Sequence, residues 1–141
     1  MVKVLLIDDK SDELQKAREA AERKGWESVV CDVSVRGPGH CNNCDWIDMV
    51  EDVDCVATDL MWDHNNRGEK PMGLCVVIHA LSRGKPVVIC TNRQDFANGH
   101  HGEAIGFIYD GYYTSTRTDP FGWEEGKDWD RAMEYLAKQM S

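Results

Sequence analysis

Four short apolar runs rich in β-branched residues mark the chain. They cover residues 2–7 (VKVLLI), 29–33, 53–60 and 86–90 (PVVIC). Runs of this kind are typical of strands that are buried on both faces, as in parallel sheets. The pattern therefore predicts four parallel strands in the interior of the protein.

Stretches with helical spacing alternate with these runs. The first starts at Ser11, a suitable N-cap, and is ended by Gly25. Apolar residues at i, i+3 and i+4 mark three further helices, over residues 46–53, 74–81 and 129–140. Strand–helix alternation with short connections predicts right-handed βαβ units. We therefore expect one α/β domain over residues 1–141. Its core is a doubly wound, five-stranded parallel sheet in the flavodoxin-like order 2-1-3-4-5, with helices on both faces.

The fifth strand is the element that the pattern leaves open. Residues 91–127 must contain it, but this stretch is rich in Gly, His and Asn. Residues 105–109 (IGFIY) are the preferred candidate, and residues 112–116 are the competitor. Both are short apolar or aromatic segments of the length of a strand.

Composition narrows the classes of function. Apolar residues make up 42% and charged residues 29%, as in an ordinary globular protein. The net charge of −9 excludes nucleic acid and anionic membrane as favoured partners, because both would repel the protein. No run approaches the roughly 20 apolar residues of a membrane span, and the first residues read as a strand rather than a signal peptide. We expect a cytoplasmic protein whose six cysteines are mostly reduced.

Acidic residues stand where the predicted strands end. Asp8 and Asp9 follow the first strand, Asp59 the third, and Thr91 follows the fourth. The first and third strands are neighbours in the expected order, so the three carboxylates would converge at the carboxyl edge of the sheet, where α/β folds place their sites. Three close carboxylates need a cation or a proton, and Mg²⁺ is the natural oxygen-liganded ion. Solvated or helix-capping acids are the alternative interpretation.

Four segments in the same order give the chain a family resemblance. VKVLLIDD at the start, VATDLM at 56–61, Gly73-Leu74, and PVVICT at 86–91 resemble the receiver domain of two-component response regulators. The resemblance implies that Asp59 is the phosphoacceptor and that Asp8 and Asp9 hold Mg²⁺. It also implies that a backbone carbonyl near Met61 assists the metal, and that the Thr91 hydroxyl turns toward the phosphoryl group.

The resemblance also implies a class of function. It predicts a stand-alone signalling domain of a two-component phosphorelay, not an enzyme, and we expect no output domain. The implied partners are a sensor kinase or phosphotransfer protein and a downstream protein. The downstream protein would bind on the face formed by the fourth and fifth strand–helix units.

One departure from the family concerns a lysine. Receiver domains carry a lysine after the fifth strand, usually before proline, and this chain has no lysine between Lys85 and Lys127. The nearest similar segment, TDPF, has Asp119 at that place, and the competing alignment has Asp110. Unless Arg117 takes the place of this lysine, a negatively charged aspartate stands where the family has a positive charge. We therefore expect slow phosphorylation of Asp59 or none, as in a degenerate domain that acts by protein binding.

Two further groups of residues leave alternatives open. A metal-binding or hydrolytic enzyme on the same fold would combine the acids with His100 and His101. The lone CxxC of Cys41 and Cys44 is half of a zinc site, a redox pair or a plain loop with reduced thiols.

Overall fold

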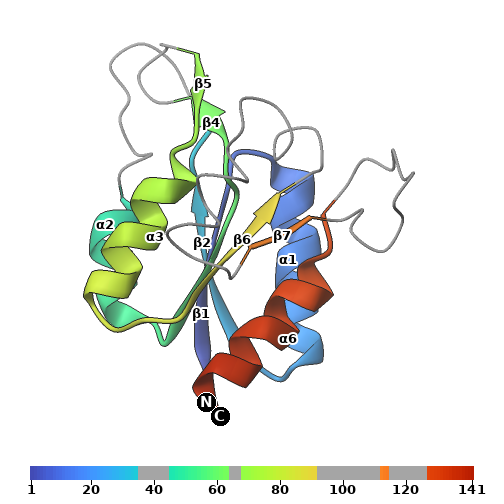
Figure 1. The fold of residues 1–141 in the computed structure, drawn as a ribbon. Coiled ribbons are helices and arrows are strands. Elements are labelled where there is room, and N and C mark those ends of the chain that lie inside the picture. Colours follow the sequence, from blue (N-terminus) through green and yellow to red (C-terminus); the bar gives the residue numbers. More distant parts are fainter. Residues whose placement is uncertain (35–44, 64–67, 92–111, 115–126) are drawn as a thin grey trace.

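Five parallel strands form the central sheet of the computed structural model, in the order β2-β1-β3-β6-β7 (Figure 1). The structure describes residues 1–34, 45–63, 68–91, 112–114 and 127–141. The strands of the sheet are β1 (Lys3–Asp8), β2 (Glu27–Asp32), β3 (Cys55–Thr58), β6 (Val87–Thr91) and β7 (Tyr112–Thr114). Counted along this sheet alone, the order is 2-1-3-4-5, so the expected doubly wound topology is confirmed.

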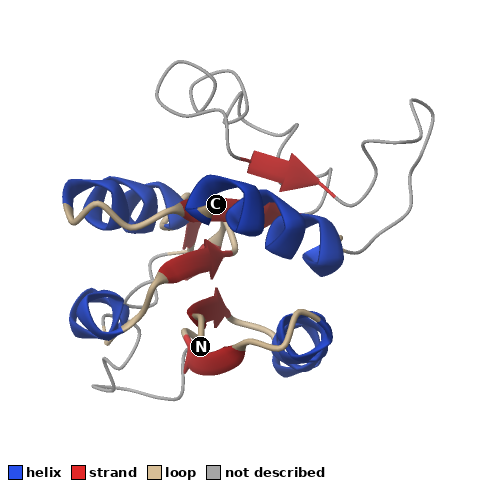
Figure 2. Cartoon of the chain, turned by 90° about the horizontal axis from the view of Figure 1, so that it is seen from below, coloured by secondary structure: helices blue, strands red, loops and turns tan. Residues whose placement is uncertain are grey.

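Helices cover both faces of the sheet, with one layer on each side of the strands (Figure 2). One layer holds α1 (Ser11–Arg23) and α6 (Trp129–Met140). The other holds α2 (Trp46–Met49), the short 3-10 helix η1 (Val50–Asp52) and α3 (Gly73–Ser82). Two hydrophobic cores result, one between each helix layer and the sheet. No helix in the described ranges is long and apolar enough to cross a membrane.

The uninterrupted apolar run of β1, residues 4–7, follows from the place of this strand between β2 and β3. Leu5 and Ile7 belong to the core under α2 and α3. Val4 and Leu6 belong to the core under α1 and α6. All four side chains are fully buried, because a parallel sheet with helices on both faces has no solvent side.

The fifth strand of the sheet is β7, which pairs in parallel with β6. It lies within residues 112–116, the competing candidate. The preferred candidate, residues 105–109, lies outside the described residues.

A small hairpin interrupts the connection after β3. Strands β4 (Trp62–Asp63) and β5 (Glu69–Lys70) pair antiparallel and stand away from the main sheet (Figure 1). The side chain of Trp62 is fully buried in the core under α2 and α3, which anchors the base of the hairpin. Two-residue strands leave no periodic signal, so the sequence pattern does not predict this hairpin.

The starts of α6 and α1 are capped differently. Asp128 caps α6, because its Oδ1 accepts a hydrogen bond from the Arg131 N–H at 3.0 Å. Ser11 is not the N-cap of α1 but its first residue, and Lys10 precedes it without a capping side chain. The Asp8 side chain accepts the Lys10 N–H at 3.0 Å, and this local turn brings the chain into the helix one residue early.

Candidate functional site

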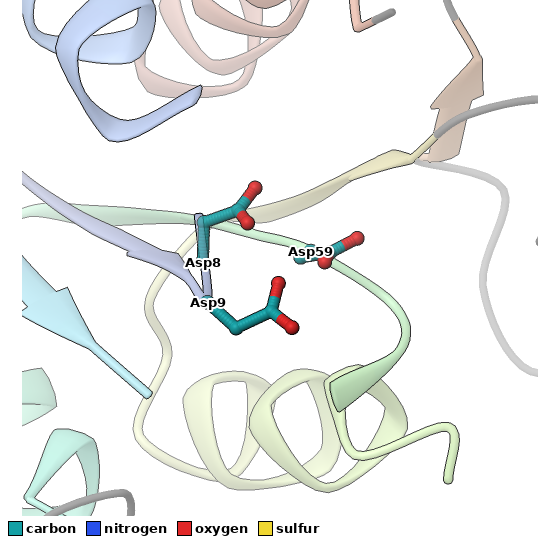
Figure 3. Close-up of side chains that lie close together, drawn as sticks. All are labelled: Asp8, Asp9 and Asp59. Carbon is teal, nitrogen blue, oxygen red and sulfur yellow. The ribbon is translucent and has the colours of Figure 1, made fainter. Parts of the chain in front are cut away.

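Three carboxylates meet at the carboxyl edge of the sheet. Asp8 ends β1 and Asp9 follows it, while Asp59 directly follows β3. Strands β1 and β3 are hydrogen-bonded neighbours with Ile7 opposite Thr58, so their ends coincide. One oxygen from each of the three carboxylates lies within 4.8 Å of the others (Figure 3). The convergence expected from the sequence is therefore present.

A lysine joins this cluster. Lys127 Nζ lies 2.5 Å from Asp8 Oδ2 and 3.0 Å from Asp59 Oδ1, and only 5% of its side chain is exposed. Its ammonium also lies 5.9 Å from the ring centroid of Trp129, the buried first residue of α6. The prediction that the site lacks a lysine is therefore wrong.

The reason for this error is the place of Lys127 in the sequence. It stands two residues before α6 and well beyond β7, whereas the family pattern places the lysine next to the fifth strand. The only signal in the sequence is that Lys127 is the first lysine after Lys85. The residues considered as substitutes, Asp110, Arg117 and Asp119, lie outside the described residues.

The charges of the site do not balance. Burial raises the pKa of Asp59 to about 7, although Lys127 acts in the opposite direction. Burial and the neighbouring Asp8 raise the pKa of Asp9 to about 6. The two carboxylates hold the pKa of Lys127 above its ordinary value, against the effect of its burial, so it stays charged. One ammonium cannot neutralise three carboxylates, and the excess is relieved by protons or by an added cation.

Hydrogen bonds distinguish the oxygens of the two buried acids. Both oxygens of Asp8 are engaged, Oδ1 by the Lys10 N–H and Oδ2 by Lys127. Asp59 Oδ1 accepts from the Leu60 N–H at 2.7 Å and from Lys127. Among the described residues, nothing donates to Asp59 Oδ2. This oxygen and the half-buried carboxylate of Asp9 are open to a ligand, and each Asp8 oxygen keeps a second lone pair for one.

The donor set fits a magnesium ion. Oxygen ligands about 2.1 Å from octahedral Mg²⁺ lie about 3 Å apart when adjacent and about 4.2 Å apart when opposite. The three carboxylate oxygens span up to 4.8 Å, so a small side-chain movement brings them into range. Met61, the residue expected to assist through its backbone carbonyl, stands two residues after Asp59 and is half-buried.

Thr91 also lies at this edge. It ends β6, which pairs with β3, and it is fully buried. Its Oγ1 has no hydrogen-bond partner in the part of the chain that the structure describes. A buried hydroxyl without a partner is costly, so it is available to a group that enters the site.

The remaining sequence candidates cannot be related to this cluster. His100 and His101, the basis of the hydrolytic alternative, lie outside the described residues. The same is true of Cys41 and Cys44.

Comparisons with known proteins give a likeness in structure alone. No protein-family model matches the chain. No curated protein matches it. Among solved structures, the receiver domain of the Francisella response regulator 1452 matches with a TM-score of 0.58 at 16% identity, covering 99% of each chain.

Two further matches are of the same kind. A response regulator receiver domain protein from Clostridium thermocellum matches with a TM-score of 0.56 at 18% identity, over 99% of this chain and 98% of that chain. A response regulator protein from Burkholderia multivorans matches with a TM-score of 0.57 at 16% identity, over 100% of this chain and 97% of that one. The chain therefore has the fold of response regulator receiver domains, with an acidic cluster at the carboxyl edge of its sheet.

Proposed function

We propose that this chain is a receiver-like signalling domain of a two-component phosphorelay and that Asp59 accepts the phosphoryl group. The observation that carries the proposal is the buried ion-paired group of Asp8, Asp59 and Lys127, with Asp9 beside it. Acids that only cap helices or face solvent do not need a buried lysine between them. A lysine held by two carboxylates, in contrast, is ready to pair with a third anionic group.

Asp59 supplies the nucleophile in this proposal. Lys127 and the Leu60 N–H both hold Oδ1, which fixes the carboxylate and leaves Oδ2 to attack. A bond forms between Oδ2 and phosphorus, and the bond from phosphorus to the donor breaks, with its electron pair leaving on the donor. The attack requires an ionised carboxylate. Because the pKa of Asp59 is raised to about 7, a nearby cation determines whether this carboxylate is ionised near neutral pH.

Magnesium is the proposed cofactor, held by Asp8, Asp9 and Asp59 with the backbone carbonyl of Met61. When bound, the ion would offset negative charge on the transferred oxygens. Lys127 would then pair with the new phosphoryl group, because that group lies on the carboxylate which the lysine already contacts. The buried hydroxyl of Thr91 would donate to a phosphoryl oxygen.

Proteins are the proposed partners on both sides of the reaction. A sensor kinase or phosphotransfer protein would supply the phosphoryl group, and a downstream protein would read the state of the domain. The acidic net charge of −9 supports protein rather than nucleic acid or membrane as the target. We expect the domain to work in the cytoplasm and without an enzymatic activity of its own beyond accepting the group.

The test is incubation with acetyl phosphate and Mg²⁺, followed by measurement of the intact mass. We expect one phosphoryl increment, which depends on Mg²⁺ and is absent in Asp59→Asn. Asp54→Asn is the matched control, since Asp54 is an exposed acid directly before β3 and outside the cluster. Labelling that persists in Asp59→Asn would contradict the proposal. No labelling of a protein that binds Mg²⁺ would instead indicate a degenerate domain that acts by binding.

A further inference from the structure

Gly73 packs directly against the backbone that carries Asp59. It is the first residue of α3. A Cβ atom at this position would lie 2.3 Å from the Asp59 carbonyl oxygen and 2.8 Å from Leu60 Cα. The Gly73 N–H also donates to the Leu60 carbonyl oxygen at 2.9 Å. The first residue of α3 therefore lies in direct backbone contact with the two residues that follow β3.

The lack of room for a side chain, and not the backbone conformation, explains why residue 73 is a glycine. Gly25, Gly68 and Gly84 have φ of +76°, +86° and +70°, a region that favours glycine, and no Cβ contact within 4 Å. Gly73 shows the opposite combination, with no positive φ and a severe Cβ contact. The contacted atoms belong to the backbone, so they cannot turn aside as the end of a side chain would.

The contacted segment carries most of the proposed chemistry. It contains the Asp59 nucleophile, the Leu60 N–H that binds Asp59 Oδ1, and the proposed carbonyl ligand of Met61. Helix α3 is a firm support for it, because Val76 and Ala80 are fully buried in the core further along the helix. The position of residues 59–61 therefore depends on how closely α3 can approach their backbone.

We infer that Gly73 is a positioning residue for Asp59: the absence of a side chain lets α3 hold the Asp59–Met61 backbone where the carboxylate meets Lys127 and the metal ligands. The chemical consequence of this role rests on the proposed function. An alanine at position 73 must push the Asp59 carbonyl away by about 1 Å to reach ordinary contact. A misplacement of about 1 Å can cost on the order of 10²-fold in rate.

The test compares Gly73→Ala with Val77→Ala, which removes buried methyl groups of the same helix one turn beyond Gly73. In Gly73→Ala we expect phosphoryl labelling to slow on the order of 10²-fold. We also expect the dissociation constant for Mg²⁺ to rise by about 10-fold or more, as when support of a metal ligand is lost. Val77→Ala should keep both values within about 2-fold of the parent protein, as expected when only stability changes. Equal labelling and Mg²⁺ affinity in Gly73→Ala and the parent would overturn the inference.

Amide NMR signals separate this inference from the proposed function. If the parent protein takes up neither Mg²⁺ nor phosphoryl groups, the proposed function fails. Gly73→Ala must still displace the Asp59 and Leu60 amide signals more than Val77→Ala does, and no such displacement overturns the inference. If Gly73→Ala does not fold, the inference is tested on the parent protein. Because the Gly73 N–H is bonded to the Leu60 carbonyl, Mg²⁺ must then shift the amide signals of Gly73 and Leu60 with one midpoint. A Gly73 signal that stays in place overturns the inference.

Discussion

Replacing Lys127 by methionine removes the cation of the acidic site and keeps a side chain of similar length. The parent lysine makes two short contacts, of 2.5 Å to Asp8 and 3.0 Å to Asp59, with 5% of its side chain exposed. At an effective dielectric of about 20, each contact represents about 6 kcal/mol of attraction. Burial of the ammonium costs several kcal/mol in return. Loss of one partner from a buried ion pair therefore destabilises by about 3–5 kcal/mol.

The loss should depend on pH and on metal. Without Lys127 the pKa values of Asp9 and Asp59, already raised to about 6 and about 7, must rise further, because their shared positive neighbour is gone. The variant can relieve this repulsion by taking up protons, so we expect a smaller loss at pH 5 than at pH 8. Mg²⁺ should restore part of the loss at pH 8, since it replaces the missing positive charge.

Urea denaturation followed by tryptophan fluorescence measures these differences. Lys138→Met is the matched control, because Lys138 lies in α6 but is exposed. We expect it to change the free energy of unfolding by less than about 0.5 kcal/mol. The reasoning is refuted if Lys127→Met also costs less than about 0.5 kcal/mol at pH 8 without Mg²⁺, or if Mg²⁺ stabilises it no more than the parent protein.

Three further predictions follow from burial and charge. Leu136 is fully buried on the inner face of α6, so Leu136→Ala should cost about 2–5 kcal/mol in urea denaturation, and a loss below about 0.5 kcal/mol would show a peripheral helix. The Thr91 hydroxyl is buried without a partner among the described residues, so Thr91→Val should keep or raise the free energy of unfolding; a loss above about 1 kcal/mol would reveal a bond to the hydroxyl. In metal-free protein the raised pKa values of Asp9 and Asp59 mean that the folded state binds more protons than the unfolded state above about pH 4. The free energy of unfolding should therefore fall from about pH 4 to pH 7, by up to about 1.4 kcal/mol per pH unit for each group. Stability that rises over this range in the presence of chelator would contradict the prediction.

Much of this protein is determined by local sequence alone. The apolar residues of β1 predict a strand buried on both faces, because only a sheet with helices on both sides can bury every side chain in turn. The spacing of Trp129, Met133 and Leu136 predicts the buried face of α6. Asp8 and Asp59 are predicted to meet because parallel neighbours end at one edge, and this rule needs no side-chain contact.

The tertiary structure alone decides the features that join distant parts of the chain. Lys127 pairs with Asp8 across 119 positions, and no periodicity or spacing rule reaches over that interval. Because no spacing rule relates Lys127 to the strands, the sequence predicts an acid at this place instead of the lysine. The physical reason for a glycine at position 73 also comes from the structure alone, because it is the close approach of α3 to the Asp59 carbonyl. Local patterns fix which face of an element is buried, whereas a close contact between two elements exists only once both are packed on the same sheet.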